Sequence, residues 1–144
     1  MQNYSYTIRL RIWHPSIKPD EITNTIGVKP DKISVAGEPR QNPKGKLLGG
    51  KYTINYWSGT PLNIRGYTSN DAEAENSLTE VINNLKPHAA FFGKLREGGG
   101  SVLLEICSYG EMNYAFEFSP DLLAQCANVN LSLVVDIYPV QQNW

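Results

Sequence analysis

A cluster of basic side chains lies between Gly37 and Lys51, in the stretch GEPRQNPKGKLLGGK. Glycine followed by lysine is typical of loops that hold phosphate, but such a loop needs a hydroxyl residue next and a helix behind it. Here Leu47 follows Gly45 and Lys46, and the residues after them have the pattern of a strand. The stretch therefore fails as a nucleotide-phosphate loop.

Arg40 is the residue of this stretch best suited to an anion, because its guanidinium can donate two parallel hydrogen bonds. Lys44 and Lys46 add charge nearby, so these three are the candidate ligand- or anion-binding residues. We expect Pro39 and Arg40 to be fixed and residues 42–50 to be mobile, because few apolar side chains occur there to offset the entropy of ordering. The other reading is that the stretch is only a surface connection.

Other candidate catalytic groups are few. Neither His14 nor His88 has a second ligand at the spacing that a zinc site needs. Cys107 and Cys126 lie among apolar residues, the usual setting of small buried thiols. The sequence therefore gives no catalytic residue, no metal site and no cofactor.

An enzyme would need polar groups from distant parts of the chain to meet. Asp136 lies in an apolar segment, where its carboxyl would either pair with an arginine of the first strand or have a shifted pKa. A small-molecule-binding or hydrolytic enzyme around Arg40, His14 and Asp136 stays open as an alternative. It requires the three side chains to lie in one pocket, within roughly 10 Å.

Charge is unevenly distributed along the chain. None of the 13 lysine and arginine residues follows Arg96, whereas six acidic residues do. Either the two parts interleave in one fold and their charges meet, or they form a dipolar surface that steers a charged partner. Outward carboxylates at Glu105, Glu117 and Asp136 would repel a phosphate backbone, so nucleic acid is a disfavoured partner.

Length and composition favour one globular domain over residues 1–144. No apolar run approaches the roughly 20 residues of a membrane span, so we expect no membrane association. The first residues lack the pattern of a signal peptide, and two cysteines are too few for a disulfide framework. We therefore expect a cytoplasmic protein.

Periodicity predicts an α+β fold with a mostly antiparallel sheet of about five strands, helices on one face, and the order β-α-β-α-β-β-α-β. Polar and apolar residues alternate in the strands, whereas the helices have apolar stripes and Pro, Asp or Gly at their ends. We expect the last strand to be central because it is almost continuously apolar. The predicted strands are 4–13, 51–58, 101–109, 113–119 and 130–139, and the predicted helices are 19–26, 120–128 and one that is capped by Asn70, has Glu73 at its third position and ends or kinks at Pro87.

The same alternation predicts the core and the outer face. Arg9 and Arg11 should point away from the core, and at least one should pair with a carboxylate from the acidic part of the chain. Exposed pairs of this kind contribute only about 0.2–1 kcal/mol. The predicted core comprises Ile8, Leu10, Ile22, Ile26, Ile54, Leu78, Ile82, Leu104, Ile106, Phe116, Leu123, Leu133 and Val135.

Three segments, IKPDEITNTIGVKPDKISVAGEPR, INYWS and LSLVVDIYP, resemble a family of small bacterial proteins classed as a domain of unknown function. The resemblance spans nearly the whole chain and implies a single cytoplasmic α+β domain from a bacterium. It implies no activity, so no residue role is transferred from it. The matching positions are Pro30, Gly37, Pro39, Arg40, Trp57 and Asp136.

The lack of catalytic chemistry favours a non-enzymatic binding module, and the expected ligand is another protein. Trp13 and Trp57 are the candidate partner-binding residues, with Trp144 as a further exposed aromatic. The binding module has a second alternative besides the enzyme. It is an immunity-type inhibitor, which would neutralise a basic toxin with the acidic part of the chain. The partner and the oligomeric state stay open.

Overall fold

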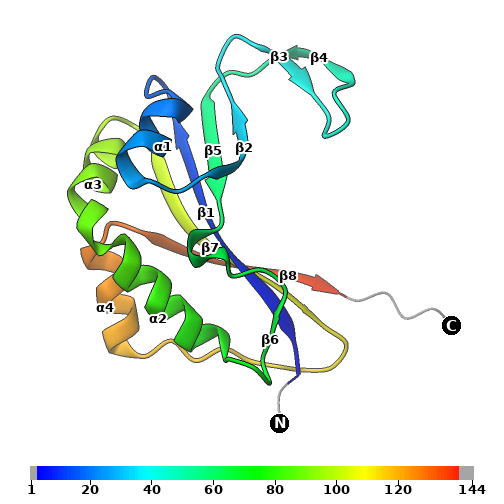
Figure 1. The fold of residues 1–144 in the computed structure, drawn as a ribbon, viewed down its shortest axis with the longest axis vertical. Helices are drawn as coiled ribbons and strands as arrows, with labels where there is room; N and C mark the ends of the chain where they lie inside the picture. Colours follow the sequence, from blue (N-terminus) through cyan, green and yellow to red (C-terminus); the bar gives the residue numbers. More distant parts are fainter. Residues whose placement is uncertain (1–2, 140–144) are drawn as a thin grey trace, which may run out of the picture.

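A computed structural model describes residues 3–139, and it has an α+β fold with a mixed sheet. The described residues form six strands of this sheet, in the order β2-β5-β1-β7-β8, with β6 beside β1 (Figure 1). All neighbouring strands are antiparallel except β7 and β8. The mostly antiparallel sheet that the sequence predicts is thus confirmed. The strands are β1 (Ser5–His14), β2 (Pro30–Ser34), β5 (Asn55–Gly59), β6 (Tyr67–Thr68), β7 (Ser101–Gly110) and β8 (Ser132–Pro139).

The helices pack on one face of the sheet and leave the other face open (Figure 1). The ends of the first and last helices follow the local signals in the sequence, whereas the second helix begins at Ala74 and not directly after Asn70 as predicted. Gly27 ends the first helix with a left-handed backbone (φ 70°), and the Ser119 hydroxyl caps the last one by accepting the Leu122 N–H. The helices are α1 (Pro19–Ile26), α2 (Ala74–Leu85), α3 (Ala89–Glu97) and α4 (Pro120–Asn128), with short 3₁₀ turns at Pro61–Asn63 and Lys86–His88. None of the helices in residues 3–139 is long and apolar enough to cross a membrane.

The core lies between the sheet and the helices. In β1 every second side chain from Tyr4 to His14 is buried, and the side chains between them face the open side. Most of the predicted core is buried, but Leu123 is 48% exposed. It is exposed because α4 buries Leu122 and Cys126, four residues apart on one helical face.

The second predicted strand is shifted, and its faces are reversed. Strand β5 pairs Trp57 with Ile12 of β1, which turns the indole into the core, where Nε1 donates to Thr23 Oγ1 at 3.0 Å. Trp57 is 0% exposed, so the prediction that it is a surface residue is wrong. Ile54, which we expected in the core, precedes the strand and is only half-buried.

Residues 113–119 form no strand, so the strand predicted there is wrong. Strand β8 runs parallel to β7, and the chain must therefore cross over through α4 before it re-enters the sheet. The crossover packs Tyr114 and Phe116 against the Tyr4 ring. The prediction that the last strand is central is also wrong. Strand β8 lies at the edge of the sheet, because the chain that leaves α4 pairs with the outer side of β7.

The stretch from Gly37 to Lys51 is not an irregular connection. It forms a two-stranded hairpin of β3 (Pro39–Gln41) and β4 (Leu47–Lys51), which projects from the main sheet (Figure 1). At its tip the Asn42 side-chain oxygen accepts the backbone N–H groups of Lys44 and Lys46, at 2.9 and 2.8 Å. The expected mobility of this tip stays a prediction.

Candidate functional site

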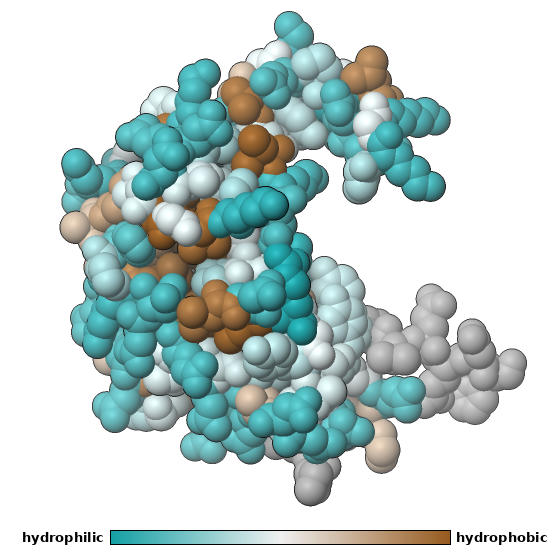
Figure 2. All heavy atoms as spheres, viewed as in Figure 1, coloured by the Kyte–Doolittle hydropathy of each residue, from teal (hydrophilic) through white to brown (hydrophobic). Residues whose placement is uncertain are grey.

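The open face of the sheet is hollowed below the projecting hairpin (Figure 2). A cavity of about 440 Å³ lies there, between the β3–β4 hairpin and the sheet. We call it the Arg40 cavity. Arg40 and Lys51 line it from the hairpin, Lys32 from β2, Arg11 from β1 and Tyr56 from β5, and Trp13, Ser34, Tyr52, Thr53 and Ile54 complete the lining.

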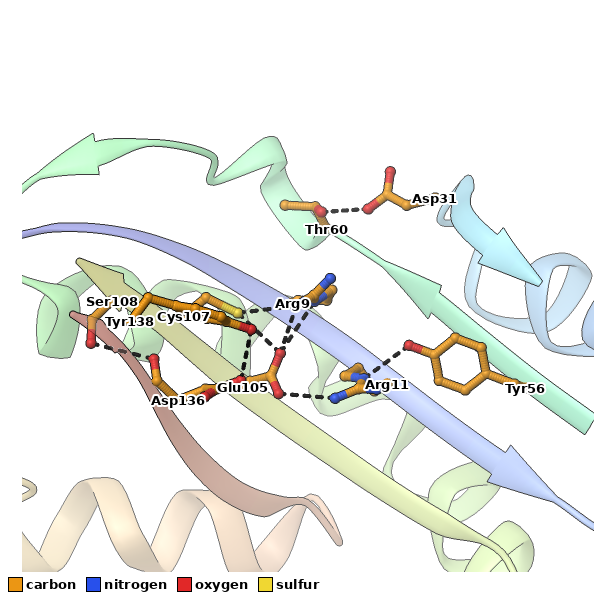
Figure 3. Close-up of polar contacts among 10 residues, drawn as sticks. All are labelled: Arg9, Arg11, Asp31, Tyr56, Thr60, Glu105, Cys107, Ser108, Asp136 and Tyr138. Atoms are coloured by element: carbon orange, nitrogen blue, oxygen red, sulfur yellow. Dashed lines mark hydrogen bonds and ion pairs between the residues drawn. The ribbon is translucent and has the colours of Figure 1, made fainter. Parts of the chain in front are cut away.

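Arg11 is held in a fixed position on the cavity floor. Its Nε donates to the Tyr56 hydroxyl at 2.9 Å, and its Nη1 donates to Glu105 at 3.0 Å (Figure 3). The guanidinium also lies 4.7 Å from the centre of the Trp13 ring. Trp13 and Tyr56 contact each other with ring centres 5.0 Å apart. The cavity floor is therefore a preorganised group of one cation and two aromatic rings.

Three other cations of the cavity have no counter-ion among residues 3–139. Lys32, Arg40 and Lys51 form no ion pair with any carboxylate of residues 3–139, and no described Asp or Glu lines the cavity. The Asp31 carboxylate, next to Lys32 in sequence, accepts the Thr60 hydroxyl and pairs with Arg65 instead. The Arg40 cavity is thus a concentrated region of positive charge.

The pKa of the Tyr52 phenol in the cavity lining is lowered, mainly by hydrogen bonds. A hydrogen bond with Gln41 and one with Ser34 lower the pKa of the Tyr52 phenol, and the charges of Lys32 and Arg40 lower it further. The charges of Lys32 and Arg40 thus act on Tyr52 in the same direction as the two hydrogen bonds. A ligand that brings its own negative charge gains from the same field.

Below the cavity, the open face carries a charge cluster that joins the basic and acidic parts of the chain. The Glu105 carboxylate accepts from Arg9 at 2.9 Å, Arg11 at 3.0 Å and the Cys107 thiol at 3.0 Å (Figure 3). The predicted pairing of a first-strand arginine is confirmed. The pair is not exposed as we expected, because the two arginine side chains cover Glu105 and leave it 3% accessible.

The ionisation states in this cluster follow from those contacts. Burial alone would raise the pKa of Glu105, but the hydrogen bonds from Cys107 and Arg9 and the positive charges of Arg11 and Arg9 outweigh it, so the pKa is lowered. Burial, reinforced by Glu105, raises the pKa of Cys107 to about 11. Cys107 is therefore a protonated thiol near pH 7 and not an activated nucleophile.

The comparison with known proteins places the chain in a family. The family model described as "Domain of unknown function (DUF4279)" matches residues 4–140. The chain belongs to this family. The match includes every strand and helix of the fold, so the Arg40 cavity is formed entirely within the DUF4279 domain. No curated protein and no solved structure matches the chain.

Within the DUF4279 domain, the three residues of the enzyme alternative do not meet. Arg40 lines the Arg40 cavity, whereas His14 is buried on the helix-covered face and lines a different cavity. Asp136 lines neither cavity, and its carboxylate accepts the Tyr138 hydroxyl at 3.0 Å. Among residues 3–139 there is also no cluster of His, Cys, Asp and Glu that could hold a metal ion.

The other candidate residues separate in the same way. Trp13 lines the Arg40 cavity, whereas Lys44 and Lys46 are at the hairpin tip, outside its lining, and Trp144 is outside the described residues. Sequence reasoning missed the contributions of Arg11, Lys32, Lys51, Tyr52 and Tyr56. The alternation of side chains in β1 could have predicted that Arg11 and Trp13 share the open face. No local pattern in the sequence predicted that β2 or the β3–β4 hairpin would lie beside them.

Proposed function

We propose that this DUF4279 protein is a non-enzymatic binding module, which receives an acidic segment of another protein in the Arg40 cavity. The observation that carries the proposal is the convergence of three unneutralised cations, Lys32, Arg40 and Lys51, on one cavity. Cations without a counter-ion repel one another, and an anionic ligand relieves that repulsion. The proposal places the module in the bacterial cytoplasm, where its two cysteines stay reduced.

Each part of the cavity has a role in this proposal. Arg40 and Arg11 can bind carboxylate oxygens through paired N–H groups, and the lysines add less directional charge. Trp13 and Tyr56 offer ring faces against which the apolar parts of a peptide can pack. Because Arg11 is already held by Glu105 and Tyr56, little of its side-chain entropy is lost when a ligand binds.

A protein segment fits this face better than a nucleic-acid strand does. The unpaired cations are confined to the end of the face near the hairpin. Toward β8 the same face carries Asp136, which forms no ion pair with a described cation. A phosphate backbone that continued along the sheet would meet that negative charge, whereas a short acidic segment would end before it.

The proposal can be tested with a fluorescein-labelled decamer of glutamate, whose binding is followed by anisotropy at about 50 mM salt, where screening is weak. The double variant Arg40→Glu/Lys51→Glu should weaken binding about tenfold or more. The matched control Lys44→Glu/Lys46→Glu changes the net charge equally, on the same hairpin but outside the cavity. It should weaken binding by no more than about threefold, through long-range electrostatics alone.

Two outcomes would overturn the proposal. Equal weakening by the two double variants would mean that the peptide responds to net charge and not to the cavity. Tighter binding of a labelled oligothymidine than of the glutamate decamer, with loss in Arg40→Glu/Lys51→Glu, would assign the cavity to nucleic acid.

A further inference from the structure

A second cavity, of about 440 Å³, lies on the helix-covered side of the molecule, between α1 and α3. We call it the His14 cavity. Its buried part is formed by His14 and Leu95, and half-buried Ile17 and Phe91 form its walls. It shares no lining residue with the Arg40 cavity, so it is a separate site.

His14 has a defined tautomer. Its Nδ1 accepts the backbone N–H groups of Ser16 and Ile17, at 3.0 and 2.8 Å, so Nδ1 carries no proton. Burial lowers the pKa of His14, which keeps the ring neutral near pH 7. The ring proton is therefore on Nε2, which makes no hydrogen bond with any group of residues 3–139 although the residue is only 4% exposed.

The turn after α3 leaves this N–H group accessible. A Cβ atom on Gly98 would lie 2.8 Å from His14 Nε2, and one on Gly100 would lie 2.8 Å from Cδ2 of the same ring. Gly98 is itself part of the cavity lining. Because residue 98 has no side chain, the Nε2–H group of this otherwise buried histidine stays accessible from the cavity and can donate to a ligand.

The rest of the lining defines the chemistry of a ligand. Ile17, Phe91 and Leu95 present apolar surface. Glu21 and Lys94 lie at the exposed mouth with opposite charges, and neither forms an ion pair with a described residue. Their charges offset each other, so the cavity does not favour a net ionic ligand as the Arg40 cavity does.

We propose that the His14 cavity is a second binding site, for a small uncharged molecule with an apolar body and one hydrogen-bond acceptor. The apolar body packs against Ile17, Phe91 and Leu95, and the acceptor receives the Nε2–H of His14. Because its donor and walls differ from those of the Arg40 cavity, this site stands whether or not the acidic partner is found.

The test uses benzamide as the probe and NMR of the full-length ¹⁵N-labelled protein. Benzamide should shift the His14 Nε2 resonance and the amide signals of Ile17 and Gly98. Toluene, which has the same ring but no acceptor, should bind about three- to tenfold more weakly, as expected for the loss of one hydrogen bond.

Two variants block the site from different sides. Gly98→Ala places a methyl group in front of Nε2; the backbone φ of −79° suits alanine, but the methyl group would lie 2.8 Å from Nε2, so the His14 ring must shift to admit it. Thr25→Trp covers the mouth from an exposed position of α1. Each should reduce benzamide affinity about tenfold or more, while the matched control Thr25→Ser should retain it.

The expected pattern is thus benzamide shifts at His14 and Gly98, weaker binding of toluene, and loss in both blocking variants. No benzamide shift at these residues up to the solubility limit of the probe would overturn the site. Unchanged affinity of the Thr25→Trp variant for benzamide would also overturn the site, even if Gly98→Ala failed to fold. Equal binding of toluene and benzamide would overturn the role of the His14 donor.

Discussion

The two faces of the sheet place tryptophan in different environments. Trp57 and Trp13 lie on neighbouring strands, but the pleat turns Trp57 toward the helices and Trp13 toward the open side. Trp57 is fully buried with its indole N–H bonded to Thr23, whereas Trp13 contacts Arg11 and Tyr56 on the floor of the Arg40 cavity. The helix-covered side therefore buries its tryptophan in the core, whereas the open side leaves its tryptophan accessible at the Arg40 cavity.

The two faces also differ in the charge states of their ionisable side chains. On the covered face the ionisable His14 is kept neutral by burial. On the open face Glu105 stays ionised because two arginines pair with it, and Lys32, Arg40 and Lys51 form no ion pair with any described residue. Unpaired cations add little to the stability of a fold. Their concentration at one cavity is therefore the observation on which the proposed binding of an acidic segment rests.

The largest expected effect compares the two tryptophans. Trp57→Ala should lower the free energy of unfolding by about 3–5 kcal/mol, because it removes a large, fully buried side chain. Trp13→Ala should cost less than about 1.5 kcal/mol, because the ring is half-exposed and its loss leaves no closed cavity. Urea denaturation followed by circular dichroism measures both. Equal losses would mean that the two faces are buried alike.

Glu105→Gln tests the charge cluster. The substitution should destabilise the protein by about 2 kcal/mol, less than a fully buried ion pair would lose, because solvent still reaches Arg9 and Arg11. Arg9→Ala should cost only about 1 kcal/mol, because Arg11 continues to neutralise the carboxylate. Chemical denaturation at pH 7 gives both values. A smaller loss for Glu105→Gln than for Arg9→Ala would contradict the central role of the carboxylate.

The ionisation of Glu105 should also determine how the free energy of unfolding depends on pH in the acidic range. Its pKa is lowered in the folded protein, so its contribution is present above the unfolded pKa of about 4.3 and is lost as pH falls through the folded value. The wild-type protein should therefore lose stability below about pH 4, with a steeper slope than Glu105→Gln. Parallel pH profiles of the two proteins would show that Glu105 does not titrate as described.

His14 gives a smaller effect at higher pH on the covered face. Its pKa is lowered by burial, so its contribution is present above the unfolded pKa of about 6.5 and is lost as pH falls from there toward the folded value. His14→Asn keeps an acceptor near the Nδ1 position for the Ser16 and Ile17 N–H groups but removes the titration. This variant should flatten the stability profile below about pH 6.5. An unchanged slope would mean that another group titrates there.

The smallest stability effects are expected at the cavity cations. Lys32→Ala, Arg40→Ala and Lys51→Ala should each change the free energy of unfolding by less than about 0.5 kcal/mol, because none forms an ion pair within the described residues. Thermal unfolding of the single variants measures this. A stabilisation on removal would show how strongly the cations repel one another, whereas a large loss would indicate a structural role for the residue concerned.

Local sequence signals predicted the elements whose ends and faces depend on neighbouring residues. The alternation of β1, the Pro19 start and Gly27 end of α1, and the Ser119 cap of α4 are all of this kind. The arginine–carboxylate pairing followed from the same alternation, because it required only that β1 and β7 share a face.

The features that the sequence did not predict depend on packing between residues that are distant in the chain. Residues 113–119 alternate as a strand does, but they carry the chain to α4 because β8 pairs in parallel with β7. Trp57 points inward because β5 pairs in one register with β1. The Arg40 cavity depends on β2 and on the β3–β4 hairpin, which bring Lys32 and Lys51 beside Arg11, and no spacing in the sequence encodes that meeting.

The most direct test of the division between the two faces is a residue-by-residue map of glutamate-decamer binding. In ¹H–¹⁵N NMR titrations, the decamer should shift the amide signals of Trp13, Ser34 and Tyr52 around the Arg40 cavity, and it should leave those of α1 and α3 unchanged. Shifts confined to the hairpin tip at Lys44 and Lys46, or spread over the helix-covered side, would contradict binding at the open face.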